Sequence, residues 1–108
     1  MAKKPVDRII TDYVKVLRDF NITVAQAILF GSYASGNASD ESDIDVAIVS
    51  PDLGRNRFSE GVMLKLLTEH VDTSISPRPY SVNEVAGSKK GSFLHDEILS
   101  KGRTIYRA

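Results

Sequence analysis

Apolar residues recur every three or four positions from Val6 to Phe20. This spacing puts them on one side of a helix, so the sequence predicts an amphipathic helix that follows Pro5 and stops at Asn21. A helix of this kind is typical of a globular domain, in which the apolar side faces the core. That side consists of Val6, Ile9, Ile10, Tyr13, Val14, Leu17 and Phe20.

Two apolar runs further along the chain predict strands. The run Val24–Phe30 is almost continuously apolar and ends abruptly at Gly31, which is typical of a strand buried on both faces. The run Asp43–Val49 predicts a second strand, which Pro51 stops because proline has no N–H to donate to a neighbouring strand.

The middle of the chain predicts another helix and a third strand. The helix spans Ser59–His70, and the strand spans Val71–Ile75 and ends before Pro77 and Pro79. The inner face of this helix is predicted to carry Val62, Met63, Leu66 and Leu67.

Helix and strand signals alternate up to this point, and the last third of the chain is less regular. Ser92 is expected to cap a final helix that Gly102 ends, and Thr104–Tyr106 is expected to add an edge strand. The alternation predicts an α/β (α+β) fold, with a small mixed β-sheet and helices packed on it. Since 108 residues is an ordinary domain size, we expect one domain over residues 1–108.

Composition narrows the possible functions. Lys and Arg together number 14, as do Asp and Glu, so no overall positive charge attracts nucleic acid or an anionic membrane. Cysteine is absent, which excludes disulfides, thiolate nucleophiles and cysteine-ligated metals. The sequence also lacks an apolar run of roughly 18 residues and an apolar signal core, so we expect a cytoplasmic protein without a membrane span.

Acidic residues gather at the second predicted strand. Strand alternation points Asp43 and Asp45 to the same face, where their like charges repel and strand propensity disfavours them. A cation between the two carboxylates would remove this conflict, and hard oxygen ligands of this kind favour Mg²⁺. The alternative is a polar start to the strand, with Asp43 ending a turn.

A third acid lies in the third predicted strand. If that strand runs beside the second, Asp72 converges with Asp43 and Asp45, and such a triad can hold two divalent ions. Asp72 would then also be the natural acceptor of a proton. The alternative is an acid at a strand edge, exposed to solvent.

The turn after the first predicted strand has the opposite electrostatics. Gly31 and Ser32 join a strand to a predicted helical turn, which Ser32 is expected to cap and Gly36 to close. Such a junction directs backbone N–H groups at an anion, and Gly31 has no side chain to keep a phosphate away. The alternative is an ordinary Gly-Ser turn.

These motifs follow one another as Phe30-Gly31-Ser32, ten further residues, Asp43-Ile44-Asp45-Val46, and then Val71-Asp72-Thr73. The arrangement resembles the DNA polymerase beta-type nucleotidyltransferase superfamily, and its length and order resemble the minimal nucleotidyltransferase (MNT) branch. The resemblance spans nearly the whole chain and implies the nucleotidyltransferase fold. Two departures are Ser35, where many minimal members have arginine, and Thr73, where a hydrophobic residue is usual.

The resemblance implies transfer of AMP from ATP to an acceptor hydroxyl, with two Mg²⁺ ions. Gly31 and Ser32 would bind the β- and γ-phosphates, and Asp43, Asp45 and Asp72 would be the catalytic metal ligands. Members of the minimal branch are commonly antitoxins of HEPN-domain toxins, so the acceptor would be a tyrosine of a HEPN partner. The alternatives are a non-catalytic antitoxin that acts by binding and a transferase for a small-molecule hydroxyl. A homo- or hetero-oligomer is compatible with a domain of this size.

Overall fold

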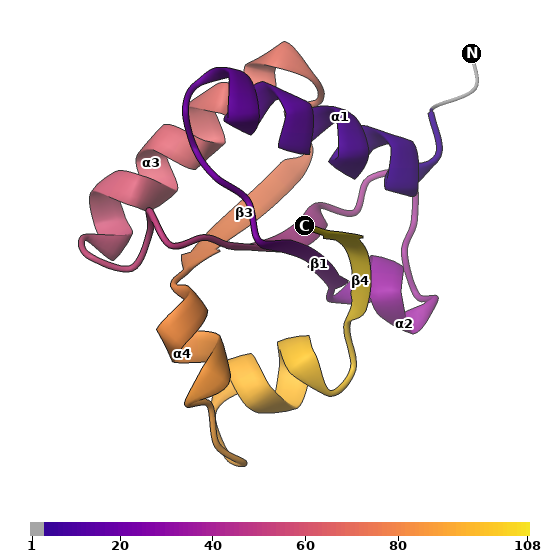
Figure 1. Cartoon of the computed structure of the whole chain (residues 1–108). Coiled ribbons are helices and arrows are strands. Elements are labelled where there is room, and N and C mark those ends of the chain that lie inside the picture. Colours follow the sequence, from indigo (N-terminus) through magenta and orange to yellow (C-terminus); the bar gives the residue numbers. More distant parts are fainter. Residues whose placement is uncertain (1–3) are drawn as a thin grey trace.

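The computed structural model describes residues 4–108, which form a four-stranded mixed sheet in the order β3-β2-β1-β4 (Figure 1). The central strand β1 runs antiparallel to β2 and β4, whereas β2 runs parallel to β3. The predicted mixed α/β fold is therefore confirmed, including the edge strand at the end of the chain. The strands are β1 (Gln26–Phe30), β2 (Ile44–Val49), β3 (Ile75–Tyr80) and β4 (Arg103–Arg107).

Helices cover both faces of the sheet. Helices α1 and α3 pack on one face, and a π-helical segment, η2, packs on the other. Within residues 4–108 no helix is both long enough and apolar enough to cross a membrane. The helical segments are α1 (Val6–Asp19), α2 (Ser32–Ser35), α3 (Arg57–Leu67), η1 (Thr68–His70), α4 (Val82–Ala86) and η2 (Leu94–Leu99).

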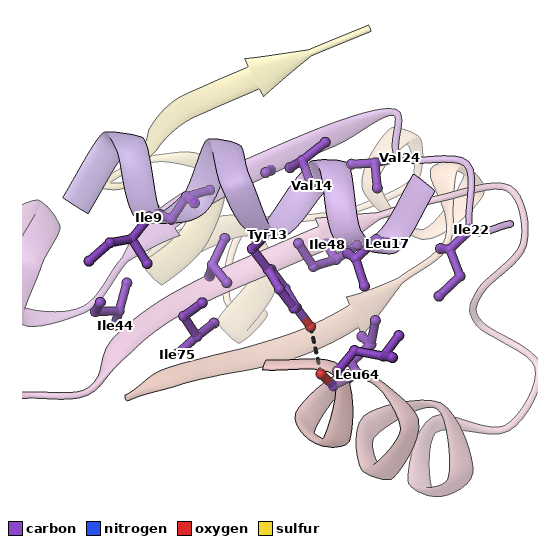
Figure 2. Packing of buried hydrophobic residues seen from close by; sticks show 14 of the residues in the cluster. Ile9, Tyr13, Val14, Leu17, Ile22, Val24, Ile44, Ile48, Leu64 and Ile75 are labelled. Carbon is purple, nitrogen blue, oxygen red and sulfur yellow. Dashed lines mark hydrogen bonds between the residues drawn. The ribbon is translucent and has the colours of Figure 1, made fainter. Parts of the chain in front are cut away.

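The larger core lies between the sheet and helices α1 and α3. Most of the apolar side predicted for the first helix packs here, but Phe20 at its end is 51% exposed. Alternate residues of β2, Ile44, Val46 and Ile48, face this core from the sheet. At its centre the hydroxyl of the buried Tyr13 donates a 2.7 Å hydrogen bond to the backbone carbonyl of Leu64 in α3 (Figure 2). Burial raises the pKa of Tyr13, so the phenol stays protonated and this bond joins the two helices.

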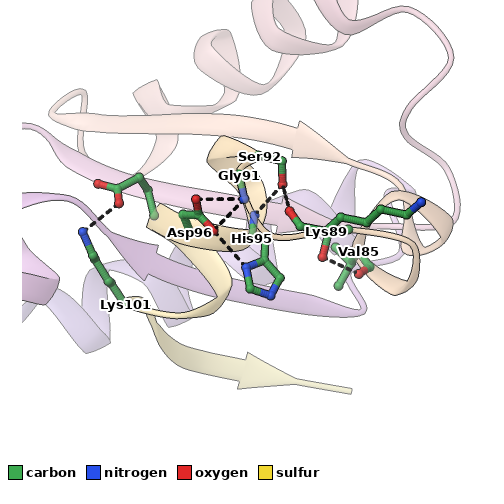
Figure 3. Close-up of polar contacts among 9 residues, drawn as sticks. Val85, Lys89, Gly91, Ser92, His95, Asp96 and Lys101 are labelled. Atoms are coloured by element: carbon green, nitrogen blue, oxygen red, sulfur yellow. Dashed lines mark hydrogen bonds and ion pairs between the residues drawn. The ribbon is translucent and has the colours of Figure 1, made fainter.

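The smaller core lies on the opposite face, where Ile98 of η2 is buried in one cluster with Ile28 of β1 and Ala47 of β2. Polar contacts hold the segment that leads into η2 (Figure 3). The Asp96 carboxylate accepts the N–H of Gly91 at 3.0 Å and contacts Nδ1 of His95 at 3.0 Å. These contacts hold the start of η2 to the turn before it, while the apolar cluster packs η2 against β1, at whose end the predicted site residues lie.

The inner face predicted for the second long helix is partly wrong. In α3, Leu64 and Leu67 are buried, whereas Val62, Met63 and Leu66 are exposed. Apolar residues surround most of this helix, so periodicity alone does not define one face. The contact with Tyr13 in α1 decides which side turns inward.

The third strand was also predicted in the wrong place. Strand β3 spans Ile75–Tyr80 and runs through both Pro77 and Pro79, while Asp72 lies before it. β3 is an edge strand, and the carbonyls of Ser74 and Tyr80 accept hydrogen bonds from β2. Backbone groups alternate sides along a strand, so the two proline nitrogens point away from β2, where no N–H is needed.

Tyr13→Phe should lower the free energy of unfolding by about 1–2 kcal/mol, because it leaves the Leu64 carbonyl without its side-chain donor. Urea unfolding followed by circular dichroism measures the loss. The matched control is Tyr33→Phe, since the Tyr33 hydroxyl makes a longer, exposed bond of 3.3 Å and its removal should cost less than about 0.5 kcal/mol. Equal losses in the two variants would contradict this account of the core.

Candidate active site

The antiparallel pairing of β1 and β2 brings the glycine turn and the acidic strand together. Phe30, the last residue of β1, lies opposite Asp45, so the following residue, Gly31, passes directly over the Asp45 side chain. A Cβ atom on Gly31 would overlap Oδ2 of Asp45. Gly31 also has φ 73° and ψ −150°, a region that is essentially restricted to glycine. Backbone shape and proximity thus both require glycine here.

The turn after Gly31 forms as predicted, with one difference. Helix α2 occupies Ser32–Ser35, and Gly36 closes it in the left-handed conformation with φ 82°. Ser32 was predicted to cap this turn, but Gly31 occupies the cap position, and its carbonyl accepts the N–H groups of Ala34 and Ser35 at 3.1 Å. The Ser32 hydroxyl is therefore not used as a cap, and the residue is half-buried beside Gly31.

The two acids of the motif differ in environment. Asp43 is exposed just before β2, whereas Asp45 is half-buried within it. Burial, and then the charge of Asp43, raise the pKa of Asp45, while Arg78 lowers it. A cation bound between the two carboxylates would offset both destabilising effects, so the donor set fits one hard cation such as Mg²⁺.

Asp45 lies at the wall of a cavity of about 620 Å³, which is within the range of ligand-binding pockets. Gly31 and Ser35 form one side of this cavity, and η2 and the residue before it form another. On the side that η2 forms, Nζ of Lys101 lies 2.8 Å from Oε2 of Glu97 (Figure 3). The complete lining is Phe30, Gly31, Ala34, Ser35, Asp45, Phe93, Glu97 and Lys101.

Sequence reasoning did not identify Phe93, Glu97 or Lys101 as site residues. Glu97 and Lys101 are four residues apart, a spacing that is typical of an ion pair along a helix and does not report a cavity. Their position at the cavity comes from the packing of Ile98 on the sheet, which no local pattern reports.

Asp72 does not join the other two carboxylates. Its Oδ1 accepts hydrogen bonds from the backbone N–H and the hydroxyl of Ser74, at 2.8 and 2.5 Å, in the turn before β3. It lines a separate hollow of about 210 Å³ together with Tyr33 and Ile44, and Ile44 belongs to the α1 side of the sheet. Among residues 4–108, no three His, Cys, Asp or Glu side chains are grouped so that they could hold a metal ion. The expected convergence of three carboxylates is therefore wrong, because β3 begins later than predicted.

The neighbours of Asp45 on β3 are a serine and an arginine. In the parallel register Ser76 lies beside Asp45, and Arg78 lies beside Ala47, so all four side chains are on one face. The Arg78 guanidinium carbon lies 4.6 Å from the centre of the Phe93 ring, which also lines the cavity. This cation–π contact holds a positive charge at the cavity edge. The prolines on either side of Arg78 concealed the strand that places it.

The site combines a glycine turn, a carboxylate pair and a cavity of this size in a small mixed sheet. This combination is suited to a nucleoside triphosphate. Residues 13–108 match the family described as Polymerase beta, Nucleotidyltransferase, and the chain belongs to this family. The predicted class, a nucleotidyltransferase, is thereby confirmed.

Individual relatives are similar over nearly the whole chain. A Methanocaldococcus jannaschii protein, provisionally named a protein adenylyltransferase, is 28% identical, and the alignment covers 93% of this chain and 97% of that one. A provisionally assigned nucleotidyltransferase from Sulfolobus solfataricus has a similar fold, with a TM-score of 0.63 at 15% identity over 99% of this chain and 92% of that one. A structure of the tri-AMPylated HEPN toxin of Shewanella oneidensis in complex with MNT antitoxin has a TM-score of 0.55 at 18% identity, covering 96% of this chain and 74% of that one.

Gly31→Ala should destabilise the protein by about 3 kcal/mol, because it adds backbone strain and a clash with Asp45. The control Gly36→Ala introduces a positive-φ alanine with no atom within 4 Å of the new Cβ, and should cost about 1 kcal/mol. Denaturant unfolding measures both. Combining Gly31→Ala with Asp45→Ala should recover part of the larger loss, and strict additivity of the two changes would contradict the contact.

Asp45→Asn should stabilise the metal-free protein at neutral pH, since the native pKa of Asp45 is raised above its ordinary value of 3.8 and its ionised form therefore disfavours folding. The advantage over wild type should shrink as the pH falls through the native pKa, where wild-type Asp45 takes up a proton. Melting temperatures of both proteins from pH 7 to pH 3.5, with chelator present, measure the difference. A difference that is constant across this range would refute the titration of Asp45 as its cause.

Proposed function

We propose that this protein transfers AMP from ATP to a hydroxyl group, and that the acceptor is a tyrosine of a HEPN-domain partner for which it acts as antitoxin. The observation that carries the proposal is the packing of Gly31 on Asp45 at the wall of a cavity of about 620 Å³. This contact joins a backbone turn suited to phosphate and a carboxylate pair suited to a cation. The reaction would take place in the cytoplasm.

The relatives support both parts of this proposal. The Methanocaldococcus protein is provisionally named a protein adenylyltransferase, and this name supports AMP transfer to a protein. The tri-AMPylated toxin in the Shewanella complex supports a HEPN acceptor, and more than one transfer to it. Similarity of fold over 96% of this chain makes the same kind of partnership a reasonable expectation.

Each site residue has a role in this proposal. Gly31 and Ser32 bind the β- and γ-phosphates, and Asp43 and Asp45 hold Mg²⁺. The bound ion would neutralise the triphosphate charge that the two carboxylates otherwise repel. The acceptor hydroxyl gives its proton to a base, the role that the resemblance assigns to Asp72. Its oxygen forms a bond to the α-phosphorus as the bond to the β-phosphate oxygen breaks, and pyrophosphate leaves. The protein contributes mainly by positioning these groups.

Two cations beside the cavity are suited to the phosphates. Arg78 is held on Phe93 at one edge, and Lys101 lines the wall that η2 forms. Because Arg78 also lowers the pKa of Asp45, it favours the ionised carboxylate that a metal ion needs. We propose that Arg78 contacts the triphosphate, where a charge-assisted hydrogen bond is strong.

A second candidate function is a non-catalytic antitoxin that acts by binding. It is favoured by one observation, the separation of Asp72 from the Asp43–Asp45 pair among the described residues. The resemblance assigns Asp72 to the catalytic metal and to the acceptor proton, and a site without this carboxylate would bind a partner without transferring AMP to it.

The decisive measurement is the mass of a co-expressed HEPN-domain protein after incubation with ATP and Mg²⁺. Wild type should add AMP in whole multiples, and Asp45→Asn should reduce the rate at least 100-fold, because a neutral amide cannot balance the charge of the ion. The control Glu41→Gln removes a neighbouring exposed acid and should leave the rate unchanged. A complex that forms with no mass gain would favour the non-catalytic antitoxin.

Two further variants refine the assignment of the site. Arg78→Gln should raise the KM for ATP about tenfold with little change in stability, consistent with the loss of one charge-assisted hydrogen bond. Asp72→Asn should retain transfer if the separation seen in the structure persists during the reaction. Loss of transfer in Asp72→Asn, with folding intact, would show that Asp72 reaches the pair when substrates bind.

A further inference from the structure

Helix α3 carries an exposed apolar stripe on the side that faces away from the sheet. Phe58 is 82% exposed, Val62 is 46% exposed and Leu66 is 61% exposed. The three residues are four positions apart, so they follow one line along the helix. Large apolar side chains in a continuous row on a small domain mark an interaction surface more often than a solvated one.

A shallow hollow of about 450 Å³ lies within this stripe, and Gly61 is part of its lining together with Phe58 and Val62. Glycine is a poor helix former, and nothing lies within 4 Å of the position where a Cβ on Gly61 would be. The described fold therefore gives no reason for glycine at this position. A glycine on an exposed helix face permits the close approach of a second helix.

The stripe is symmetric about Val62. Phe58 precedes Val62 by four residues and Leu66 follows it by four. Arg55 lies two residues before the start of α3, and Glu69 lies two residues after its end, in η1. Both charged residues are exposed, and neither forms an ion pair within residues 4–108. An antiparallel second copy of the same helix would place Phe58 against Leu66 and Arg55 near Glu69. The two-fold axis makes each of these contacts occur twice.

We propose that the protein forms a homodimer in which two copies of α3 pack antiparallel across a two-fold axis at Val62. An interface of this kind must be self-complementary, and the positions and charges of the stripe meet that requirement. The remaining charged groups of α3 already have partners: Arg57 pairs with Glu84, the Glu60 carboxylate accepts backbone N–H groups before the helix, and Lys65 donates to two carbonyls.

The proposed interface leaves the candidate active site free. α3 packs on the face of the sheet that Ile44, Val46 and Ile48 form, whereas the cavity with Asp45 lies on the opposite face beside η2. The dimer therefore does not depend on the proposed transfer, and the formal net charge of zero does not oppose self-association.

The first test is sedimentation equilibrium of the protein alone over a wide concentration range. The wild type should approach twice its mass of 11.9 kDa. Val62→Glu should weaken the dimer at least 100-fold, because the axis brings the two new carboxylates together in an apolar surface. The matched control is Val82→Glu on α4, where the valine is 41% exposed, and it should leave the dimer intact.

The second test exchanges charges between two samples. Arg55→Glu alone and Glu69→Arg alone should each weaken the dimer about tenfold, since each pairs like charges at both ends of the stripe. An equimolar mixture of the two variants should dimerise as tightly as wild type, because every pair then joins an acid to a base. A variant that is merely misfolded would not be rescued by mixing, and circular dichroism checks the fold of each.

Two results would overturn the proposal. One is a wild type that stays monomeric up to its solubility limit, which would leave α3 to a different partner. The other is a dimer that Val62→Glu does not weaken, which would place the interface elsewhere.

Discussion

The candidate site depends on one close approach, between the backbone of Gly31 and the carboxylate of Asp45. The register of β1 and β2 imposes it, since Phe30 lies opposite Asp45 and the chain must turn over that side chain as it leaves the strand. A larger residue at position 31 would displace the carboxylate or unpair the strands. A conformation restricted to glycine thus brings the turn at Gly31 and an acidic strand to one cavity.

The sheet separates two surfaces with different properties. On one face, α1 and α3 bury the larger core, and the Tyr13–Leu64 hydrogen bond fixes which side of α3 turns inward. That same rotation leaves the apolar stripe of α3 outside. On the other face, η2 covers less of the sheet, and the uncovered part is the cavity beside Asp45. The larger core, the exposed stripe and the candidate site therefore lie at separate places on a small chain.

The position of β3 accounts for the main difference between the expected site and the observed one. Pro77 and Pro79 argue against a strand when every residue is assumed to need its N–H. On an edge strand, alternate residues face away from the sheet, and both prolines occupy those positions. The strand therefore begins at Ile75, after Asp72, and brings Arg78 to the face of Asp45. The residues of a strand do not by themselves show whether it lies at the edge of a sheet.

The sequence by itself determined the mixed α/β fold, the first helix, the first two strands and the Gly31–Asp45 site, because each depends on spacing within a short stretch or between adjacent segments. Tertiary structure alone decided which face of α3 is buried, where β3 begins, and which residues of η2 line the cavity. These features arise from contacts such as Tyr13 with Leu64 and Ile98 with the sheet. Such contacts join residues far apart in the chain, and no local pattern of polar and apolar residues specifies them.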